Sequence, residues 1–228
     1  METIVITGAN RGIGLELTRQ YLAAGDRVIA TCRLPAEAVE LRQLAPQGPL
    51  SILALEIADE LSTEAFRQAI GGTAVDVLIN NAGVLGGSQQ ALGDMDYAQW
   101  LHTFEVNTIA PFRITSALLE NLRQSTRPRV IALSSQMGAL SRKSKGSFAY
   151  RSSKAALNKV MQVLALELEA LGIVVCPVHP GWVRTDMGGP GADISVQESA
   201  AGLVRLVRGL TLADTGRFWT WDGQEHAW

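Results

Sequence analysis

Short β-rich runs alternate with longer helical patterns along the whole 228-residue chain, and this alternation constrains the fold more than any other feature. Val, Ile, Leu and Ala dominate most of the runs, as expected for strands buried on both faces. Strands separated by helices form βαβ units, which place the strands parallel in one sheet. The predicted strands begin at Thr3, Arg27, Leu50, Val75, Arg129, Val174 and Arg217. We therefore expect an α/β protein with a Rossmann-type, doubly wound parallel sheet of about seven strands and helices on both faces.

No Pro/Ser-rich linker, block of like charges or internal repeat divides the chain. Residues 1–228 are therefore predicted to form a single domain, with a substrate loop near residues 185–196. Hydrophobic residues make up 47% of the chain and charged residues 18%, which favours a well-buried core and argues against a disordered chain.

Charge and cysteine patterns argue against several classes of partner. The net charge is -2 and the 20 Lys and Arg residues are scattered, so we expect no nucleic-acid binding. Cys32 and Cys176 lie in separate apolar runs without nearby Cys or His ligands, so no metal site is expected. The first predicted strand follows Met1 almost directly, and no apolar stretch approaches the ~18 residues of a membrane span. We expect a cytoplasmic protein with no membrane partner.

The segment TGANRGIG, residues 7–14, follows the first predicted strand and opens the first predicted helix, which is the context of a dinucleotide-binding loop. Gly8 permits a tight turn, Gly12 lets backbone N–H groups approach a pyrophosphate, and Gly14 allows close packing of helix on strand. The pyrophosphate would lie at the helix N-terminus, where free N–H groups favour an anion. A Gly-rich turn without a ligand looks the same in isolation, so the assignment depends on further motifs.

Tyr150 and Lys154 are four residues apart in a helix predicted to begin near Phe148, so they lie on one helix face. A tyrosine hydroxyl with a pKa of about 10 is a poor base at neutral pH. A neighbouring ammonium favours the phenolate and brings proton exchange within range. A packing tyrosine beside a surface lysine would have the same spacing.

Four motifs, in order, resemble those of the short-chain dehydrogenase/reductase family: TGANRGIG at 7–14, NNAG at 80–83, YRSSK at 150–154 and PG at 180–181. The resemblance extends along essentially the whole chain. The strings YRSSKAALN and HPGWVRTDMGGP most resemble the C-factor and sniffer-type carbonyl reductase branch. The resemblance implies an NAD(P)-dependent oxidoreductase that transfers a hydride between NADP(H) and a carbonyl or alcohol substrate, with Tyr150 as general acid/base.

The resemblance also implies roles for two residues near the tyrosine. Ser135 would hydrogen-bond the substrate carbonyl, and Asn107 would support a water that links Lys154 to solvent. Ser135 could instead terminate a strand, and Asn107 could bend or cap its helix. The separation of Ser135 from Tyr150 slightly exceeds the usual family spacing, because residues 142–146 lengthen the loop.

The cofactor-binding positions implied by the resemblance are spread over the strand ends. Glu56 occupies the place of the acid that usually holds the adenine amino group, with Asp59 as a competing candidate, and Thr185 would hold the nicotinamide carboxamide or serve only as a loop or N-cap residue. The full set is Gly8, Asn10, Arg11, Gly12, Ile13, Gly14, Arg33, Glu56, Ile57, Asn81, Ala82, Gly83, Tyr150, Lys154, Pro180, Val183 and Thr185.

The end of the second predicted strand, residues 29–33, contains no acid to hold a ribose 2′-hydroxyl. Arg33 offers a bidentate fork to a 2′-phosphate, and Arg11 is placed to add a second positive charge. NADP(H) is therefore predicted to be preferred, with NAD(H) possible. Arg33 could alternatively be a solvated surface residue.

Residues 185–196 and the loop after Ser135 are expected to select the substrate, and the shortness of the first segment favours small or exposed carbonyl compounds. The resemblance implies a homodimer or homotetramer, for which the helical runs 97–122 and 153–171 are candidates. It also leaves open a second function, that of an NAD(P)-binding signalling or sensor protein of the C-factor type.

Overall fold

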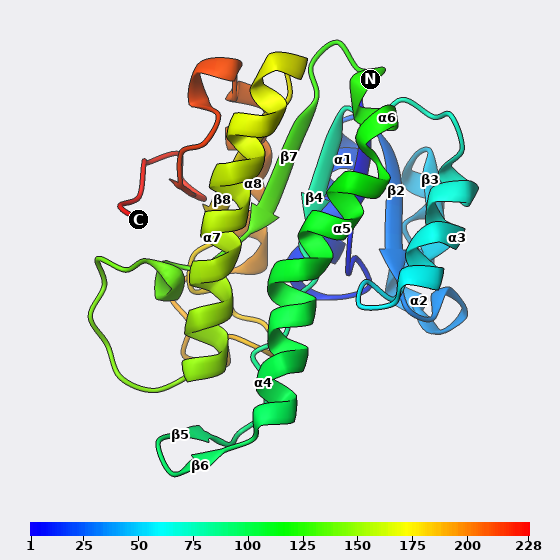
Figure 1. The fold of residues 1–228 in the computed structure, drawn as a ribbon. Helices are drawn as coiled ribbons and strands as arrows, with labels where there is room; N and C mark the ends of the chain where they lie inside the picture. Colours follow the sequence, from blue (N-terminus) through cyan, green and yellow to red (C-terminus); the bar gives the residue numbers. More distant parts are fainter.

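The computed structural model describes residues 1–228, and a seven-stranded parallel sheet with the order β3-β2-β1-β4-β7-β8-β9 lies at its centre (Figure 1). The strands are β1 Thr3–Ile6, β2 Arg27–Cys32, β3 Leu50–Ala54, β4 Val77–Asn80, β7 Arg129–Leu133, β8 Val174–His179 and β9 Trp219–Thr220. All neighbouring pairs in this sheet are parallel. The predicted α/β fold of Rossmann type with about seven strands is confirmed.

Two strands begin two residues later than predicted, because the first predicted residue of each bonds outside the sheet. The N–H of Val75 donates to the carbonyl of Asn121, and the N–H of Arg217 donates within a turn to Asp214. β4 and β9 therefore begin at Val77 and Trp219.

Helices cover both faces of the sheet, with α1 and α8 on one side and α4, α5 and α7 on the other (Figure 1). Their bounds are α1 Gly12–Ala23, α2 Val39–Arg42, α3 Glu60–Ile70, α4 Tyr97–Phe104, α5 Ala110–Ala117, α6 Leu119–Arg123, α7 Phe148–Leu168 and α8 Val196–Gly209. A short hairpin of β5 Gln90–Ala91 and β6 Asp94–Met95 precedes α4. No helix is both long enough and apolar enough to span a bilayer.

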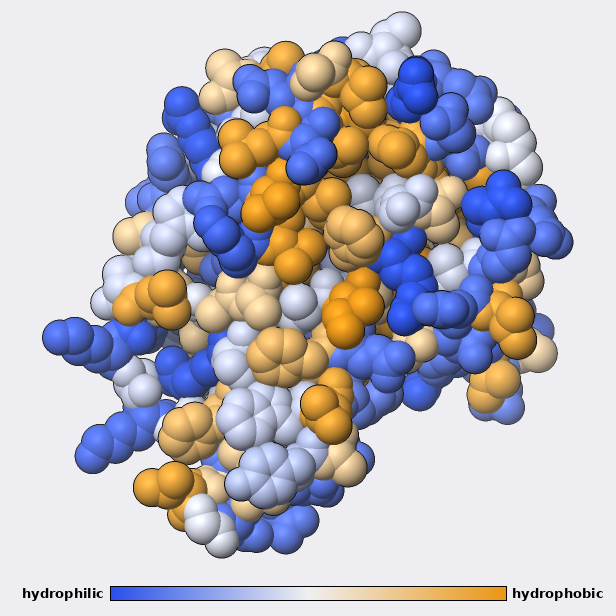
Figure 2. Space-filling view, in the orientation of Figure 1, coloured by the Kyte–Doolittle hydropathy of each residue, from blue (hydrophilic) through white to orange (hydrophobic).

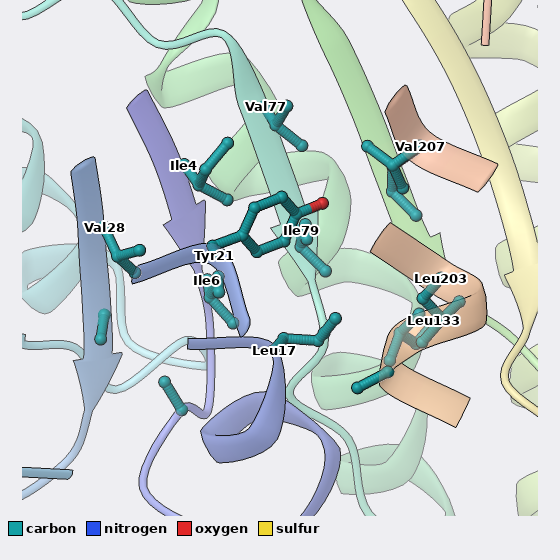
Figure 3. Packing of buried hydrophobic residues seen from close by; sticks show 14 of the residues in the cluster. Ile4, Ile6, Leu17, Tyr21, Val28, Val77, Ile79, Leu133, Leu203 and Val207 are labelled. Atoms are coloured by element: carbon teal, nitrogen blue, oxygen red, sulfur yellow. The ribbon is translucent and has the colours of Figure 1, made fainter. Parts of the chain in front are cut away.

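Alternating strand residues supply two separate cores, one on each face of the sheet. Ile4 and Ile6 point toward α1 and α8, where Tyr21 packs among the strand residues (Figure 3). Val5 and Leu78 point to the opposite face and pack with residues of α3, α5 and α7. Burial on both faces explains why the strands are almost uniformly apolar.

The helical run 97–122 is divided rather than continuous. A π-helical turn, Glu105–Ile109, follows α4, and Pro111 lies in the first turn of α5, where it lacks an N–H to donate. Asn107 is part of the π turn and is almost fully buried. The irregular turn therefore lies beside the carboxyl ends of the strands, where ligands bind in open α/β sheets.

Candidate active site

The glycine loop between β1 and α1 packs so closely on the loop after β4 that side chains do not fit. Gly8 and Gly12 have positive φ angles of 64° and 55°. A Cβ on Gly8 would lie 2.9 Å from the Cβ of Ala82. A Cβ on Gly14 would lie 2.5 Å from Nδ2 of Asn81 and 2.6 Å from the carbonyl oxygen of Gly8. Gly8 is therefore required for both packing and backbone conformation, and Gly14 for packing.

Hydrogen bonds fix the same two loops to each other. Oγ1 of Thr7 accepts the backbone N–H groups of Asn81 and Ala82, at 3.0 and 3.1 Å. Nδ2 of Asn81 donates to the carbonyl oxygens of Thr7 and Gly8, at 2.7 and 3.0 Å. The NNAG segment thus supports the glycine loop from the side of β4.

Backbone N–H groups of residues 10–14 donate to no acceptor within the protein. Helix α1 begins among them, has no side-chain N-cap and carries no acidic residue in its first turn. By contrast, Asp59 and Ser195 cap α3 and α8 with their side chains. Free N–H groups at an uncapped helix N-terminus suit a bound anion, so this loop fits the pyrophosphate of a dinucleotide.

The two arginines expected at a 2′-phosphate have different partners in this structure. Nη1 of Arg33 lies 4.0 Å from Oε2 of Glu56, and both side chains are largely exposed. Nη1 of Arg11 lies 2.7 Å from Oδ2 of Asp186, in the loop after β8. Arg33 and Glu56 therefore lie together just beyond β2 and β3, whereas Arg11 connects the glycine loop to the opposite loop.

The structure separates the two acids that competed for the adenine position. Asp59 accepts the N–H of Ser62 at 2.6 Å and is the N-cap of α3. Glu56 lies two residues beyond β3 beside buried Ile57, whose carbonyl oxygen accepts a hydrogen bond from Arg113. Glu56 remains the candidate, because the Asp59 carboxylate already serves its helix.

Ser135, Tyr150 and Lys154 come together beyond the end of β7. Nζ of Lys154 donates to the carbonyl oxygen of Leu133, the last residue of β7, at 2.8 Å. The same nitrogen lies 5.8 Å from the centre of the Tyr150 ring. Ser135 follows Leu133 by two residues, and its Oγ accepts the N–H of Met137 at 3.1 Å. A phenol, an amine and a hydroxyl therefore share the carboxyl edge of the sheet.

Burial controls the protonation of this group. It lowers the pKa of Lys154 to about 8, because the ammonium loses water. It raises the pKa of Tyr150 above its usual value, while hydrogen bonding to Ser135 lowers it. Desolvation of the phenol therefore has the largest effect on its pKa, and the shift toward the phenolate expected from the Lys154 ammonium does not appear. Tyr150 therefore keeps its proton, which suits a proton donor.

The Asn107 side chain joins the loop after β4 to α7. Its Oδ1 accepts the N–H of Val84 at 2.9 Å, and its Nδ2 donates to the carbonyl of Val84 and to Oγ of Ser153, at 2.8 and 3.0 Å. Gly83 lies between Asn107 and Lys154, because a Cβ there would be 3.2 Å from Oδ1 and 3.5 Å from Nζ. The water relay through Asn107 stays a prediction.

The loop after β8 approaches the glycine loop. A Cβ on Gly12 would lie 3.5 Å from Cγ2 of Thr185. Oγ1 of Thr185 accepts the N–H of Gly188 at 3.1 Å, Val183 is buried, and the carbonyl of Pro180 accepts the hydroxyl of Ser199 at 2.6 Å. Thr185, which is expected to hold the nicotinamide carboxamide, therefore lies beside the glycine loop.

Sequence reasoning missed two residues that shape the site. A Cβ on Gly138 would lie 2.6 Å from the carbonyl carbon of Lys154, so only glycine lets the turn after Ser135 lie against α7. Ser153 is fully buried and donates to the carbonyl of Tyr150 at 2.8 Å. Gly138 could have been identified from the sequence as a glycine three residues after Ser135, whereas no sequence pattern indicated the burial of Ser153.

No group of three or more His, Cys, Asp and Glu side chains is placed to hold a metal ion. Cys32 and Cys176 are free, buried thiols.

This chain is similar to known proteins in both sequence and fold. Residues 2–193 match the family model described as short chain dehydrogenase. C-signal of Myxococcus xanthus is 45% identical over 165 residues, covering 72% of this chain and 99% of that protein. The carbonyl reductase Sniffer of D. melanogaster has a TM-score of 0.94 at 30% identity over 100% of both chains. The NADPH-bound carbonyl reductase from chicken fatty liver has a TM-score of 0.93 at 33% identity, covering 100% of this chain and 99% of that chain.

The lowered pKa of Lys154 makes stability depend on pH. Below about pH 8 the native state bears the cost of a buried ammonium. Between about 8 and the ordinary value of 10.5, the native state loses this proton before the unfolded chain does. The free energy of unfolding of the wild type, relative to Lys154→Met, should therefore rise by about 2 kcal/mol from pH 7 to 9.5. Urea unfolding at several pH values measures it.

Lys159→Met, which alters an exposed ammonium on the same helix, is the matched control for this experiment. A stability difference for Lys154→Met that stays constant across this range would show that the ammonium is not desolvated in the native protein.

Proposed function

Since this chain belongs to the short-chain dehydrogenase/reductase family, and to its C-factor and sniffer type as predicted, we propose that it is an NADP(H)-dependent carbonyl reductase. The observation that carries this proposal is the convergence of Ser135, Tyr150 and Lys154 at the carboxyl edge of the sheet that also bears the glycine loop. It is an NAD(P)-dependent oxidoreductase, and its reaction reduces a ketone or aldehyde or runs in reverse.

NADP(H) supplies the hydride when bound. The free N–H groups of residues 10–14 would hold its pyrophosphate, and Arg33 would pair with its 2′-phosphate. Arg11 would add charge at the phosphate if it exchanged Asp186 for that partner. The complex of the chicken carbonyl reductase with NADPH, a relative of the same fold, supports this choice of cofactor.

Tyr150 would transfer the proton. In reduction its protonated phenol donates to the carbonyl oxygen, and in oxidation the phenolate takes the proton back from the alcohol. The hydroxyl of Ser135 would orient the carbonyl oxygen and stabilise the developing negative charge. Lys154 would stabilise the phenolate left after donation, because its ammonium is buried within 5.8 Å of the ring centre.

The substrate would enter between the loop after Ser135 and the segment 185–196. Leu140 and Met187 on these segments are exposed rather than folded over a deep cavity. This exposure favours small or surface-exposed carbonyl substrates over large enclosed ones.

A signalling or sensor function is the second candidate. It is supported by the C-signal relative, which is 45% identical over 165 residues. Binding of a partner, with the dinucleotide as a structural ligand, would then be the biological output. Tight NADPH binding with no oxidation of NADPH across a panel of ketones and aldehydes would favour this function over the reductase.

Self-association is proposed through the outer face of α5 and α7. Figure 2 shows hydrophobic side chains gathered over this part of the surface. Ile109 and Phe112 project from the π turn and α5, and Val163 and Leu166 project from α7; all four are at least 45% exposed. The spacing within each pair places its members on one helix face. Covering this patch with a second copy would form a homodimer, alone or within a tetramer.

Removing the phenolic hydroxyl tests the proposed acid. Tyr150→Phe keeps the ring in its packing site and deletes the proton, so kcat for carbonyl reduction should fall by about 10² to 10⁴. The Kd for NADPH, measured by fluorescence, should change little. Turnover at the wild-type rate would refute the role of Tyr150.

Removing the Arg33 guanidinium tests cofactor preference. Arg33→Ala should raise the Kd for NADPH by roughly 10-fold to 100-fold, the value of a charge-assisted hydrogen bond, and leave the Kd for NADH nearly unchanged. Arg42→Ala, which removes an exposed arginine in α2, is the control. Equal losses for both cofactors would show that Arg33 does not read the 2′-phosphate.

Placing a charge in the apolar patch tests self-association. Leu166→Glu should shift the sedimentation coefficient from that of an oligomer to that of a monomer, because a carboxylate is costly to bury. Leu61→Glu changes a residue of similar exposure on α3 and should leave the assembly intact. A wild-type chain that sediments as a monomer at all concentrations would contradict this proposal.

A further inference from the structure

The side chain of Gln90, in β5, connects the loop after the NNAG segment to the helix that carries the tyrosine. Its Oε1 accepts the backbone N–H of Tyr150 at 3.2 Å. Its Nε2 lies within hydrogen-bonding distance of the carbonyl oxygens of Leu85, Gly86 and Gly87, at 2.9, 2.7 and 2.9 Å. Three acceptors on one side and one donor on the other determine which amide atom faces which way.

The N–H that Gln90 accepts, that of Tyr150, is at a helix position whose N–H usually bonds the side chain of the N-cap residue. An N-cap side chain bonds the N–H of the third helical residue. In this protein Asp59 does so for α3, Asp96 for α4 and Ser195 for α8. In α7 the third helical residue is Tyr150.

Helix α7 lacks this local cap. Ser147 occupies the N-cap position, but its side chain makes no capping hydrogen bond. Its φ of 52° and ψ of 47° place it in the left-handed region, and it has the only positive φ among non-glycine residues. The extended backbone that N-cap residues usually adopt is therefore absent at the start of the helix.

We infer that Gln90 is a positioning residue that caps α7 from outside the helix and thereby holds Tyr150 in place. The cap acts on the backbone of the tyrosine itself, so its loss would let the first turn of α7 fray at the residue that moves the proton. This inference rests on the proposed function only for its effect on turnover, since the cap is a property of the fold.

The same side chain also connects the tyrosine to the NNAG segment. Residues 85–87 continue the chain beyond Gly83 and Val84, and Asn107 anchors Val84 to Ser153 of α7. A Cβ on Gly86 would lie 3.4 Å from Nε2 of Gln90 and 3.5 Å from the Cβ of Ala149, so loop, glutamine and helix are in contact. Gln90 thus keeps a fixed relation between the loop beside the glycine turn and the phenol.

Two substitutions separate the cap from the loop contacts. Gln90→Glu keeps an oxygen for the Tyr150 N–H, where a negative charge also suits the helix N-terminus, but replaces the donor to the loop carbonyls with a carboxylate oxygen that they repel. Gln90→Met has similar length and removes both. Gln89→Met is the matched control, because Gln89 is the neighbouring glutamine and its side chain bonds only Asp94 within the hairpin.

Hydrogen exchange at the Tyr150 amide tests the cap without any assay of turnover. We expect the fastest exchange in Gln90→Met, a smaller loss of protection in Gln90→Glu, and wild-type protection in Gln89→Met. Unchanged protection in Gln90→Met would overturn the proposed cap.

Turnover tests the consequence for the site. With active sites counted by NADPH binding, Gln90→Met should lower kcat for carbonyl reduction by about 10-fold, as a small misplacement of a reacting group does. The Kd for NADPH should stay within about 2-fold, and Gln90→Glu, which keeps the cap but not the loop contacts, should recover part of the lost kcat. Unchanged kcat in Gln90→Met, or equal losses in both variants, would overturn the positioning role. If even the wild type reduces no carbonyl compound, the proposed function fails and the exchange result alone decides the cap.

Discussion

The hydrogen bond from the Lys154 ammonium to the carbonyl of Leu133 is the contact on which the site depends. Burying a cation is costly, and a well-placed acceptor offsets part of that cost. Here the acceptor is the last residue of a central strand, so the bond fixes α7 against the sheet. Ser135 follows the same strand end, and Gly138 lets the turn beyond it lie on the helix. This one hydrogen bond therefore helps to place the Ser135 hydroxyl, the Lys154 amine and the Tyr150 phenol together.

A second set of contacts joins loops that are distant in sequence. Asn81 and Thr7 fix the glycine loop to the segment after β4, and Asn107 fixes the next residues to α7 through Ser153. These bonds are partly or fully buried, and they hold the anion-binding N–H groups and the proton donor in one frame. A preorganised frame of this kind spares the protein reorganisation when charge develops in the reaction.

Displaced pKa values alone do not identify the site. Burial raises the pKa of Cys176 to about 12 and lowers that of His179 to about 4, yet neither residue belongs to a cluster of reactive groups. Tyr150 and Lys154 differ because their perturbed groups lie close together beside the Ser135 hydroxyl. They also share the carboxyl edge of the sheet with the uncapped N-terminus of α1. Convergence of groups, and not the size of a shift, distinguishes a catalytic arrangement from ordinary burial.

The sequence alone determined the parallel α/β fold, the family and the candidate residues, because strand alternation, glycine spacing and the Tyr150–Lys154 interval are local patterns. The predicted starts of β4 and β9 were two residues early, since Val75 bonds to distant Asn121 and Arg217 bonds within a turn to Asp214. Only the tertiary structure assigned Asp59 to its helix cap, paired Arg11 with Asp186, and showed that burial raises the pKa of Tyr150. It also brought Gln90 to a helix start 60 residues away. The burial of single polar groups and the contacts between distant segments arise from packing, and they leave no periodic signal in the chain.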